Sequence, residues 1–281
     1  VLKSGLMLFR IEDLWNDTRA NANIISILQG YSDPRLERWF ATNNADIYST
    51  DDELSPVVEK ATKYLGVRQG VPMTRTEYQG YSKTSRVGIP EQGPRPVLRV
   101  AEAYFLRAEG MLRNWNMGDG TPESLYNEGI HSAWASVLGD ESGWAGTYES
   151  YINGFINTEE GGDFDWELFE GGFGSAPYIN YRNQEYNYYI EENGKQVGIN
   201  RISVRWHDED SPEKKLQRII TQKWISFFPT LSSVAWTEYR RTGYPKLIPI
   251  PSDLNYSNGA IDTELQIRLS LIHISEPTRP Y

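Results

Sequence analysis

The feature that most limits how this chain can fold is a pair of helical patterns separated by a short break. In the first pattern, apolar residues recur at the spacing of one helix face: Val97, Val100, Ala101, Tyr104, Ala108, Met111 and Leu112. Residues 114–120 interrupt it, after which Thr121 is a good N-cap and Pro122 suits a first helical turn. The second stripe comprises Tyr126, Ile130, Ala133, Trp134 and Val137. These patterns predict one helical hairpin of tetratricopeptide-like length over 97–137.

Further helices are predicted on both sides of this hairpin. The pattern over 213–228 stops at Pro229, and that over 232–241 is closed by Gly243 and Pro245. The first thirty residues also have a helical pattern, and Asp33 with Pro34 marks another helix start. Residues 41–95 and 139–212 are rich in turn-forming residues, so we expect long loops there. The predicted fold class is mainly α with long ordered loops.

Composition excludes several classes of function. The net charge is −10, with 38 acidic against 28 basic residues and no basic stripe, so nucleic acid is not an expected partner. The absence of cysteine excludes disulfides, thiolate catalysis and cysteine-bound metals. No apolar run approaches the about 18 residues of a membrane-spanning helix. Residues 1–20 have no signal-peptide pattern, and the first residue is Val1, which suggests that an upstream portion precedes it.

Polar aromatic residues are abundant: 9 Trp and 18 Tyr accompany only 9 Phe. Such rings suit half-exposed surfaces, and their faces stack on the apolar C–H face of a pyranose. The alternative is that they anchor long loops to a helical core. We take as candidate ligand-binding residues those in or beside the loops: Tyr78, Tyr81, Trp115, Trp144, Tyr148, Trp166, Tyr178, Tyr181 and Asn183.

Evidence for a metal site or for catalysis is sparse. Asp163, Asp165 and Glu167 alternate in a Gly-flanked loop, which makes them weak calcium candidates, but the full twelve-residue calcium-loop spacing is missing. His131 and His207 have no partner at metal-ligand spacing, and no G-x-S-x-G is present. No motif singles out a pair of carboxylates for glycoside hydrolysis. We therefore predict no cofactor and no enzyme activity.

Charged residues in two helices suggest structural pairs. Glu109 and Arg113 are spaced for an i,i+4 pair on the solvent-facing side of the first hairpin helix. Arg240 and Arg241 lie in the string EYRRTGYP, where they would either pair with a ligand carboxylate or tie the last helix to acidic neighbours. The second interpretation is the favoured one, because arginine forks commonly serve as such clamps.

Strings at several separated places resemble SusD/RagB-type proteins. AEAYFLRAEGMLR (101–113) with LYNEGIHSAW (125–134) resembles the helical hairpin of that family. ITQKWISFF (220–228) with AWTEYRRTGYPKLIP (235–249) resembles its C-terminal signature. DPRLERWF (33–40) and YLGVRQG (64–70) resemble its central region, so the matches cover most of residues 30–250 in order.

The resemblance implies a SusD-like fold with tetratricopeptide-like units and a function in nutrient uptake. Such proteins are lipid-anchored on the outer face of the outer membrane in Bacteroidetes-like bacteria. They cover a SusC-type TonB-dependent β-barrel transporter and capture oligosaccharides for import. The expected ligand is accordingly a glycan, the expected partner is the transporter, and the membrane is contacted only through an N-terminal lipid anchor that this chain does not contain.

The two ends of the chain depart from the family. We expect residues 1–268 to form a partial domain that lacks the family's N-terminal portion, and 269–281 (LSLIHISEPTRPY) to be a non-native tail. Two alternatives to glycan capture remain open. One is a glycoside hydrolase acting on polysaccharides, and the other is a helical scaffold that binds peptide or protein.

Overall fold

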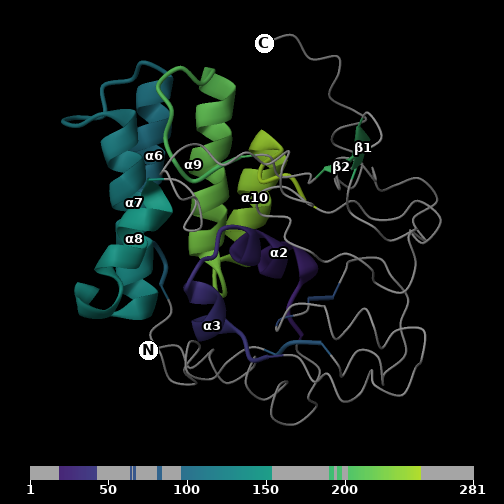
Figure 1. Ribbon diagram of the computed structural model, residues 1–281. Helices are drawn as coiled ribbons and strands as arrows, with labels where there is room; N and C mark the ends of the chain where they lie inside the picture. The colour runs from purple at the N-terminus through teal and green to yellow at the C-terminus, as the bar shows by residue number, and fades with distance from the viewer. Residues whose placement is uncertain are drawn as a thin grey trace, which may run out of the picture.

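The computed structural model describes residues 19–42, 64, 66–67, 81–83, 96–153, 190–192, 195–197 and 202–247. Within these ranges the chain is mainly α-helical, as the sequence predicts (Figure 1). The helices are α2 (Ala22–Gly30), α3 (Arg35–Trp39), α6 (Val100–Leu112), α7 (Pro122–Leu138), η2 (Glu141–Gly143), α8 (Ala145–Ile152), α9 (Pro212–Phe227) and α10 (Ser232–Thr242). The described strands, β1 (Ile190–Glu192) and β2 (Lys195–Val197), pair antiparallel with Ile190 opposite Val197.

The predicted hairpin forms one side of the helical layer, and α9 lies between it and α10 (Figure 1). Helices α6 and α7 pack along their length, and α9 packs against both of them (Figure 1). Gly129 on α7 allows the close approach, because a Cβ at this position would lie 2.6 Å from Cε1 of Phe105 on α6. Phe105 and Ile130 are fully buried, so the apolar stripes recognised in the sequence do form the hairpin interface.

Local signals in the sequence set the helix ends. Thr121 and Ser124 form a capping box at the start of α7, with Ser124 N donating to Thr121 Oγ1 at 3.1 Å. At the start of α9, the Ser211 side chain accepts a hydrogen bond from Lys214 N at 3.3 Å. At the end of α10, Gly243 has φ 72°, the left-handed conformation that glycine adopts most readily.

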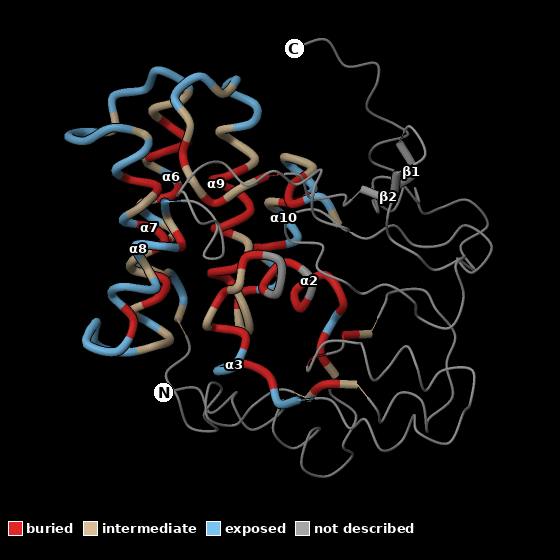
Figure 2. Tube along the Cα trace, viewed as in Figure 1, coloured by how far each residue is buried: buried red, intermediate tan, exposed pale blue. Residues whose placement is uncertain are grey.

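The core continues from the hairpin to α2 and α3, as the buried segments in Figure 2 show. Ile25 and Leu28 of α2 are fully buried. Two tyrosine hydroxyls attach the segment before α9 to this core: Tyr31 donates to Ile202 O at 2.8 Å and Tyr126 donates to Val204 O at 2.7 Å. Buried carbonyl groups of an irregular segment thereby gain partners, which an apolar contact alone would not supply.

One part of the predicted loop over 139–212 is helical instead. Residues 141–143 form η2, with Asp140 Oδ1 accepting from Ser142 N, and 145–152 form α8. The sequence signal for α8 is weak because Gly146, Thr147 and Tyr148 are poor helix formers. Burial of Trp144 and Tyr151 against the hairpin stabilises this short helix, so tertiary packing overrides the local preference.

The early segment agrees with prediction where it is described, except that the N-cap residue of α3 is Pro34 and not Asp33. Residues 22–30 are helical, while residues 1–18 lie outside the described ranges. Helix α3 follows Pro34, and Asp33 Oδ1 accepts a hydrogen bond from Arg35 N at 2.9 Å. None of the described helices combines the length and the apolar character needed to cross a membrane.

Candidate functional site

The structure describes four of the predicted ligand-binding residues: Tyr81, Trp115, Trp144 and Tyr148. The remaining candidates lie outside the described residues and stay predictions: Tyr78, Trp166, Tyr178, Tyr181 and Asn183. The same holds for the calcium candidates Asp163, Asp165 and Glu167. Among the residues that are described, no cluster of three or more His, Asp and Glu side chains is arranged to hold a metal ion.

Trp144 and Tyr148 belong to an aromatic cluster beside α7 rather than to a loop surface. Trp144 is only 6% exposed, and its ring centroid lies 5.7 Å from those of both Trp134 and Tyr148. The Tyr148 hydroxyl donates to Asn127 O at 2.8 Å, and burial raises the pKa of Tyr148 well above its ordinary value. A side chain that is 6% exposed offers almost no surface to a sugar, so the anchoring interpretation is favoured for Trp144.

His131 lies at the edge of this aromatic cluster. Its Nε2 is 2.5 Å from Glu141 Oε1, and its ring centroid is 5.3 Å from those of Trp144 and Tyr148. The imidazole therefore links α7 to η2. These contacts give His131 a packing role in the described structure.

Tyr81 is half-buried and packs against the main core. The next residue, Ser82, accepts a hydrogen bond from Ala20 N at 2.8 Å, while Ala41 N donates to Lys83 O at 2.8 Å. This short described segment thus lies between the chain entering α2 and the chain leaving α3. Its backbone bonds fix Tyr81 at the margin of the core.

Trp115 differs from the other three described candidates because its side chain is 62% exposed. It lies in the connection between α6 and α7, which occupies one end of the helical layer and is mostly exposed (Figure 2). The Arg113 guanidinium lies over the indole, with Cζ 6.0 Å from the ring centroid. Among the candidate rings that the structure describes, this one has the surface that a stacking ligand requires.

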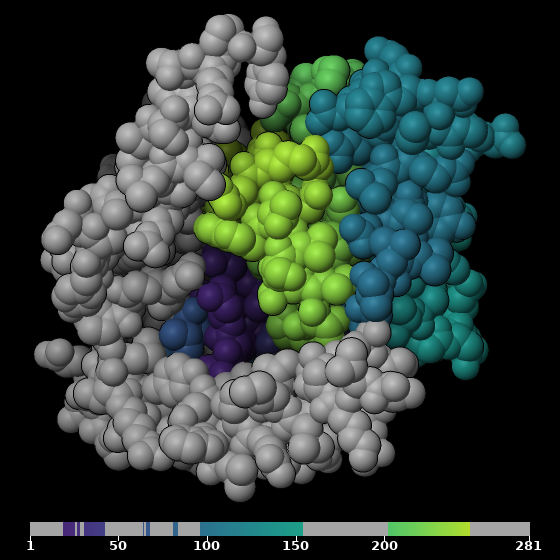
Figure 3. Space-filling model, turned by 180° about the vertical axis from the view of Figure 1, so that it is seen from behind, coloured from purple at the N-terminus to yellow at the C-terminus, as the bar shows by residue number. Residues whose placement is uncertain are grey.

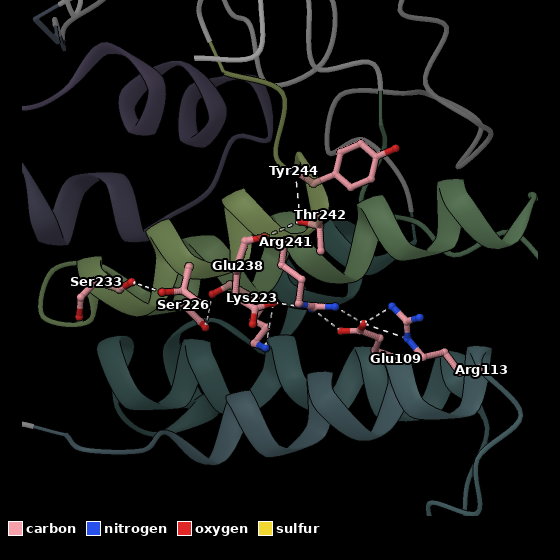
Figure 4. Close-up of polar contacts among 10 residues, drawn as sticks. Glu109, Arg113, Lys223, Ser226, Ser233, Glu238, Arg241, Thr242 and Tyr244 are labelled. Atoms are coloured by element: carbon pink, nitrogen blue, oxygen red, sulfur yellow. Dashed lines mark hydrogen bonds and ion pairs between the residues drawn. The ribbon is translucent and has the colours of Figure 1, made fainter. Parts of the chain in front are cut away.

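Charged side chains connect α6, α9 and α10 near this connection (Figure 4). Arg241 on α10 donates through Nη1 to Glu109 Oε1 at 2.6 Å and through Nη2 to Glu109 Oε2 at 2.7 Å. Arg241 also pairs with Glu238 at 2.6 Å, and Glu238 lies 3.4 Å from the buried Nζ of Lys223 on α9. The structure therefore confirms that Arg241 ties the last helix to acidic neighbours.

Glu109 also pairs with Arg113, as its sequence spacing predicts, with Arg113 Nη2 at 2.8 Å from Glu109 Oε1. The prediction that Glu109 faces solvent is wrong, because this side chain is buried between α6 and α10. Burial alone would raise its pKa, but hydrogen bonds from Arg241 and Arg113 outweigh that effect and hold the pKa of Glu109 below its ordinary value. Glu109 is thus a charged partner shared by two guanidinium groups.

A second polar network, which the sequence does not indicate, lies inside the core. Asp33 accepts from Arg35 Nε at 2.9 Å and from the Tyr151 hydroxyl at 2.9 Å, and Gln222 Nε2 donates to that hydroxyl at 3.0 Å. Asp33, Arg35 and Gln222 are all buried. Each member is hydrogen-bonded within the network, which is what makes burial of these charges tolerable. Its geometry serves to join α3, α8 and α9.

Comparison with known proteins agrees with the resemblance seen in the sequence. A model of the SusD-like family, described as Susd and RagB outer membrane lipoprotein, matches residues 6–151 and 173–276. Among curated proteins, no sequence matches this chain. Solved structures do match, and several are SusD homologues.

A chitin-binding SusD homologue from Flavobacterium johnsoniae is 32% identical in sequence, with a TM-score of 0.64 over 93% of this chain and 44% of its own. A SusD homologue from Bacteroides uniformis is 26% identical, with a TM-score of 0.65 over 93% of this chain and 45% of its own. A third, from Bacteroides thetaiotaomicron, is 28% identical, with a TM-score of 0.65 and coverages of 92% and 44%.

This chain therefore corresponds to less than half the length of the SusD homologues that it matches. The match of the family model extends over most of the chain, and both helices of the hairpin fall inside it. The mainly helical architecture of the described residues is the architecture expected of that family. The chain belongs to the SusD-like family of outer-membrane lipoproteins.

Proposed function

We propose that this chain is part of a surface protein that binds a glycan and passes it to a SusC-type TonB-dependent transporter for import. The observation that carries the proposal is the family match together with 32% identity to a chitin-binding homologue over 93% of the chain. The intact protein would be held at the outer face of the outer membrane by an N-terminal lipid anchor. Residues 1–268 would act as one partial domain, with 269–281 as a non-native tail.

Capture rather than cleavage is the proposed chemistry. Hydrolysis of a glycoside needs two carboxyl groups facing each other across a cleft, about 5–10 Å apart. The buried carboxylates of the described core are committed instead to arginines: Asp33 to Arg35, and Glu109 to Arg113 and Arg241. Their arrangement supports a structural assignment for these groups, and so favours binding over an enzyme acting on the same polymers.

A helical scaffold for peptides is the alternative suggested by the tetratricopeptide-like hairpin. Such a scaffold would present helix faces to its ligand. In this chain the facing surfaces of α6 and α7 are filled by Phe105, Tyr126 and Ile130, all fully buried. Trp115, whose exposed fraction of 62% exceeds the 44% of Trp236 on α10, lies instead in the connection between the two helices, which supports a ligand at the end of the hairpin.

The experiment that tests the proposal is native affinity electrophoresis of the purified chain in gels containing plant, algal and host polysaccharides. Binding of chitin oligosaccharides is measured separately by calorimetry. Reducing ends are assayed in the same samples. Retardation by one polymer without new reducing ends is the expected result. New reducing ends would show that the protein is a hydrolase. If the folded chain binds none of the glycans, the proposal of glycan capture is wrong.

A further inference from the structure

The connection between α6 and α7 is held in one conformation by its own contacts. Arg107 on α6 donates from Nε to Met117 O at 3.0 Å and from Nη2 to Asp119 O at 2.8 Å. Trp115 N donates to Gly110 O at 3.0 Å, and Asn116 Oδ1 accepts from Gly118 N at 3.2 Å. A side chain carried by such a pre-organised segment binds a ligand with little further loss of conformational entropy.

The Trp115 ring is available on this segment. One face of the indole has the Arg113 guanidinium above it, and 62% of the residue's surface is open to solvent. The arginine restricts how the ring can turn, since leaving it would forfeit the cation–π contact. The result is an ordered aromatic surface of the kind that stacks on the apolar face of a pyranose ring.

The Arg113 guanidinium places a positive charge beside that ring. Arg113 donates from Nε and from Nη2 to Glu109 Oε1, at 3.2 and 2.8 Å. The same carboxylate also accepts from both Nη atoms of Arg241, which pairs with Glu238 at 2.6 Å as well, so Glu109 is shared between two guanidinium groups. The Arg113 side chain is 46% exposed. A guanidinium in this setting favours a carboxylate over a hydroxyl, because charge-assisted hydrogen bonds are the stronger ones.

We propose that Trp115 and Arg113 form a binding site for an acidic pyranose residue, such as a uronic acid, in an oligosaccharide. The sugar ring stacks on Trp115, and its carboxylate pairs with the exposed edge of Arg113. This inference rests on the proposed glycan-binding function and names the chemical class of the ligand. The ends of the hairpin helices supply the rigid base of the site, which is the arrangement that positions a ligand most accurately.

The test is isothermal titration calorimetry with three acidic oligosaccharides, namely oligogalacturonate, oligomannuronate and hyaluronan fragments, and with the carboxyl-reduced form of each. A chitin oligosaccharide is included as a neutral glycan. Each variant is first checked by circular dichroism, so that loss of binding is not confused with loss of fold. Trp115→Ala should weaken binding of the acidic ligand about tenfold or more, as removal of an aromatic anchor does.

Arg113→Gln should lower the affinity for the acidic oligosaccharide toward that of its carboxyl-reduced form, and should remove most of the salt dependence. Its fold is expected to persist because Arg241 remains bonded to both oxygens of Glu109. The matched control is Trp236→Ala, since Trp236 is 44% exposed on α10, whose outer surface is visible in Figure 3. This control should bind as the wild type does.

The possible results separate the two proposals. If Trp115→Ala binds as tightly as the wild type, the site is overturned while glycan capture stands. If the carboxyl-reduced ligand binds as well as the acidic one, or only neutral glycans bind, the acidic class is overturned and capture again stands. If the folded chain binds neither acidic nor neutral glycans, both proposals fail.

Discussion

Tyr151 donates a hydrogen bond of 2.9 Å to Asp33, a residue 118 positions earlier in the chain. Arg35 pairs with the same carboxylate, and Gln222 bonds to the Tyr151 hydroxyl, so one buried acid joins helices that are remote in sequence. The rings of Tyr31 and Tyr151 meet edge to face beside this network, with centroids 6.3 Å apart. Burial is the main reason that the pKa of Tyr151 lies well above its ordinary value, so its hydroxyl stays a donor.

Asp33→Ala should destabilise the chain by about 3–5 kcal/mol, because it leaves the buried guanidinium of Arg35 without its counter-ion. Tyr151→Phe removes the hydrogen bonds of the hydroxyl with Asp33 and Gln222 but keeps both charges, so its cost should be about 1–3 kcal/mol. Urea unfolding followed by circular dichroism measures both. Equal costs for the two variants would contradict the view that Asp33 serves chiefly as the partner of Arg35.

Gly129→Ala should destabilise the chain although alanine is the better helix former. A Cβ at position 129 would lie 2.6 Å from Cε1 and 2.8 Å from Cδ1 of the fully buried Phe105. Overpacking of this kind costs about 1–3 kcal/mol, which exceeds the about 1 kcal/mol that alanine gains in helix propensity.

Gly146→Ala on α8 is the matched control, since nothing lies within 4 Å of a Cβ built there. It should leave stability unchanged or raise it by up to about 1 kcal/mol. Thermal unfolding compares the two variants. A stabilised Gly129→Ala variant would show that α6 and α7 can separate without cost.

The stabilisation contributed by Glu109 should depend on pH. Its pKa in the folded chain lies below the ordinary value of 4.5, so the unfolded state takes up protons first as the pH falls. The contribution is therefore fully present above about pH 4.5 and is lost as the pH falls through the folded-state pKa. Glu109→Gln should thus be less stable than the wild type at pH 6, with the difference narrowing below pH 4.5.

Urea midpoints from pH 6 downward measure this narrowing. The control is Glu149→Gln on the exposed side of α8, whose stability difference from the wild type should be small at pH 6. A Glu109→Gln difference that stays constant with pH would show that the carboxylate contributes through its shape and not through its charge.

Thr121→Ala should cost about 1 kcal/mol by removing the cap of α7. Thr121 Oγ1 accepts from Ser124 N at 3.1 Å, and Ser124 Oγ in turn accepts from Thr121 N at 2.8 Å. Thr121→Ser keeps the acceptor and should lie within about 0.5 kcal/mol of the wild type. Thermal unfolding of the wild type and the two variants measures these differences in stability. If Thr121→Ala is as stable as Thr121→Ser, the capping box does not stabilise the chain.

Much of the helical framework could be predicted because its signals are local. The start of α7 follows from Thr121 and Pro122, and the end of α10 follows from Gly243. Helices α6 and α9 lie within three residues of the limits that their apolar periodicity indicates. Arg241 was also predicted correctly as a structural clamp, since a guanidinium at a helix end among acidic residues has few other uses.

The buried networks and helix α8 could not be predicted in the same way. Nothing near Asp33 in sequence indicates that Tyr151 and Gln222 become its neighbours, and α8 exists because Trp144 and Tyr151 find a hydrophobic surface on α7. The partner that buries Glu109 is 132 residues away, on α10. Contacts at such separations depend on the whole arrangement of helices.

By itself, the sequence determined the longer helices α6, α7, α9 and α10 and the family, because periodicity, caps and motif strings are properties of short stretches of chain. Only the tertiary structure decided which polar aromatic rings are free. Trp115 and Trp144 both lie beside glycine-containing turns, yet one is 62% exposed and the other 6%. The physical reason is that burial is set by what packs against a ring: Trp144 meets Trp134 and Tyr148 on neighbouring helices, whereas Trp115 extends from the end of the hairpin with Arg113 over its indole.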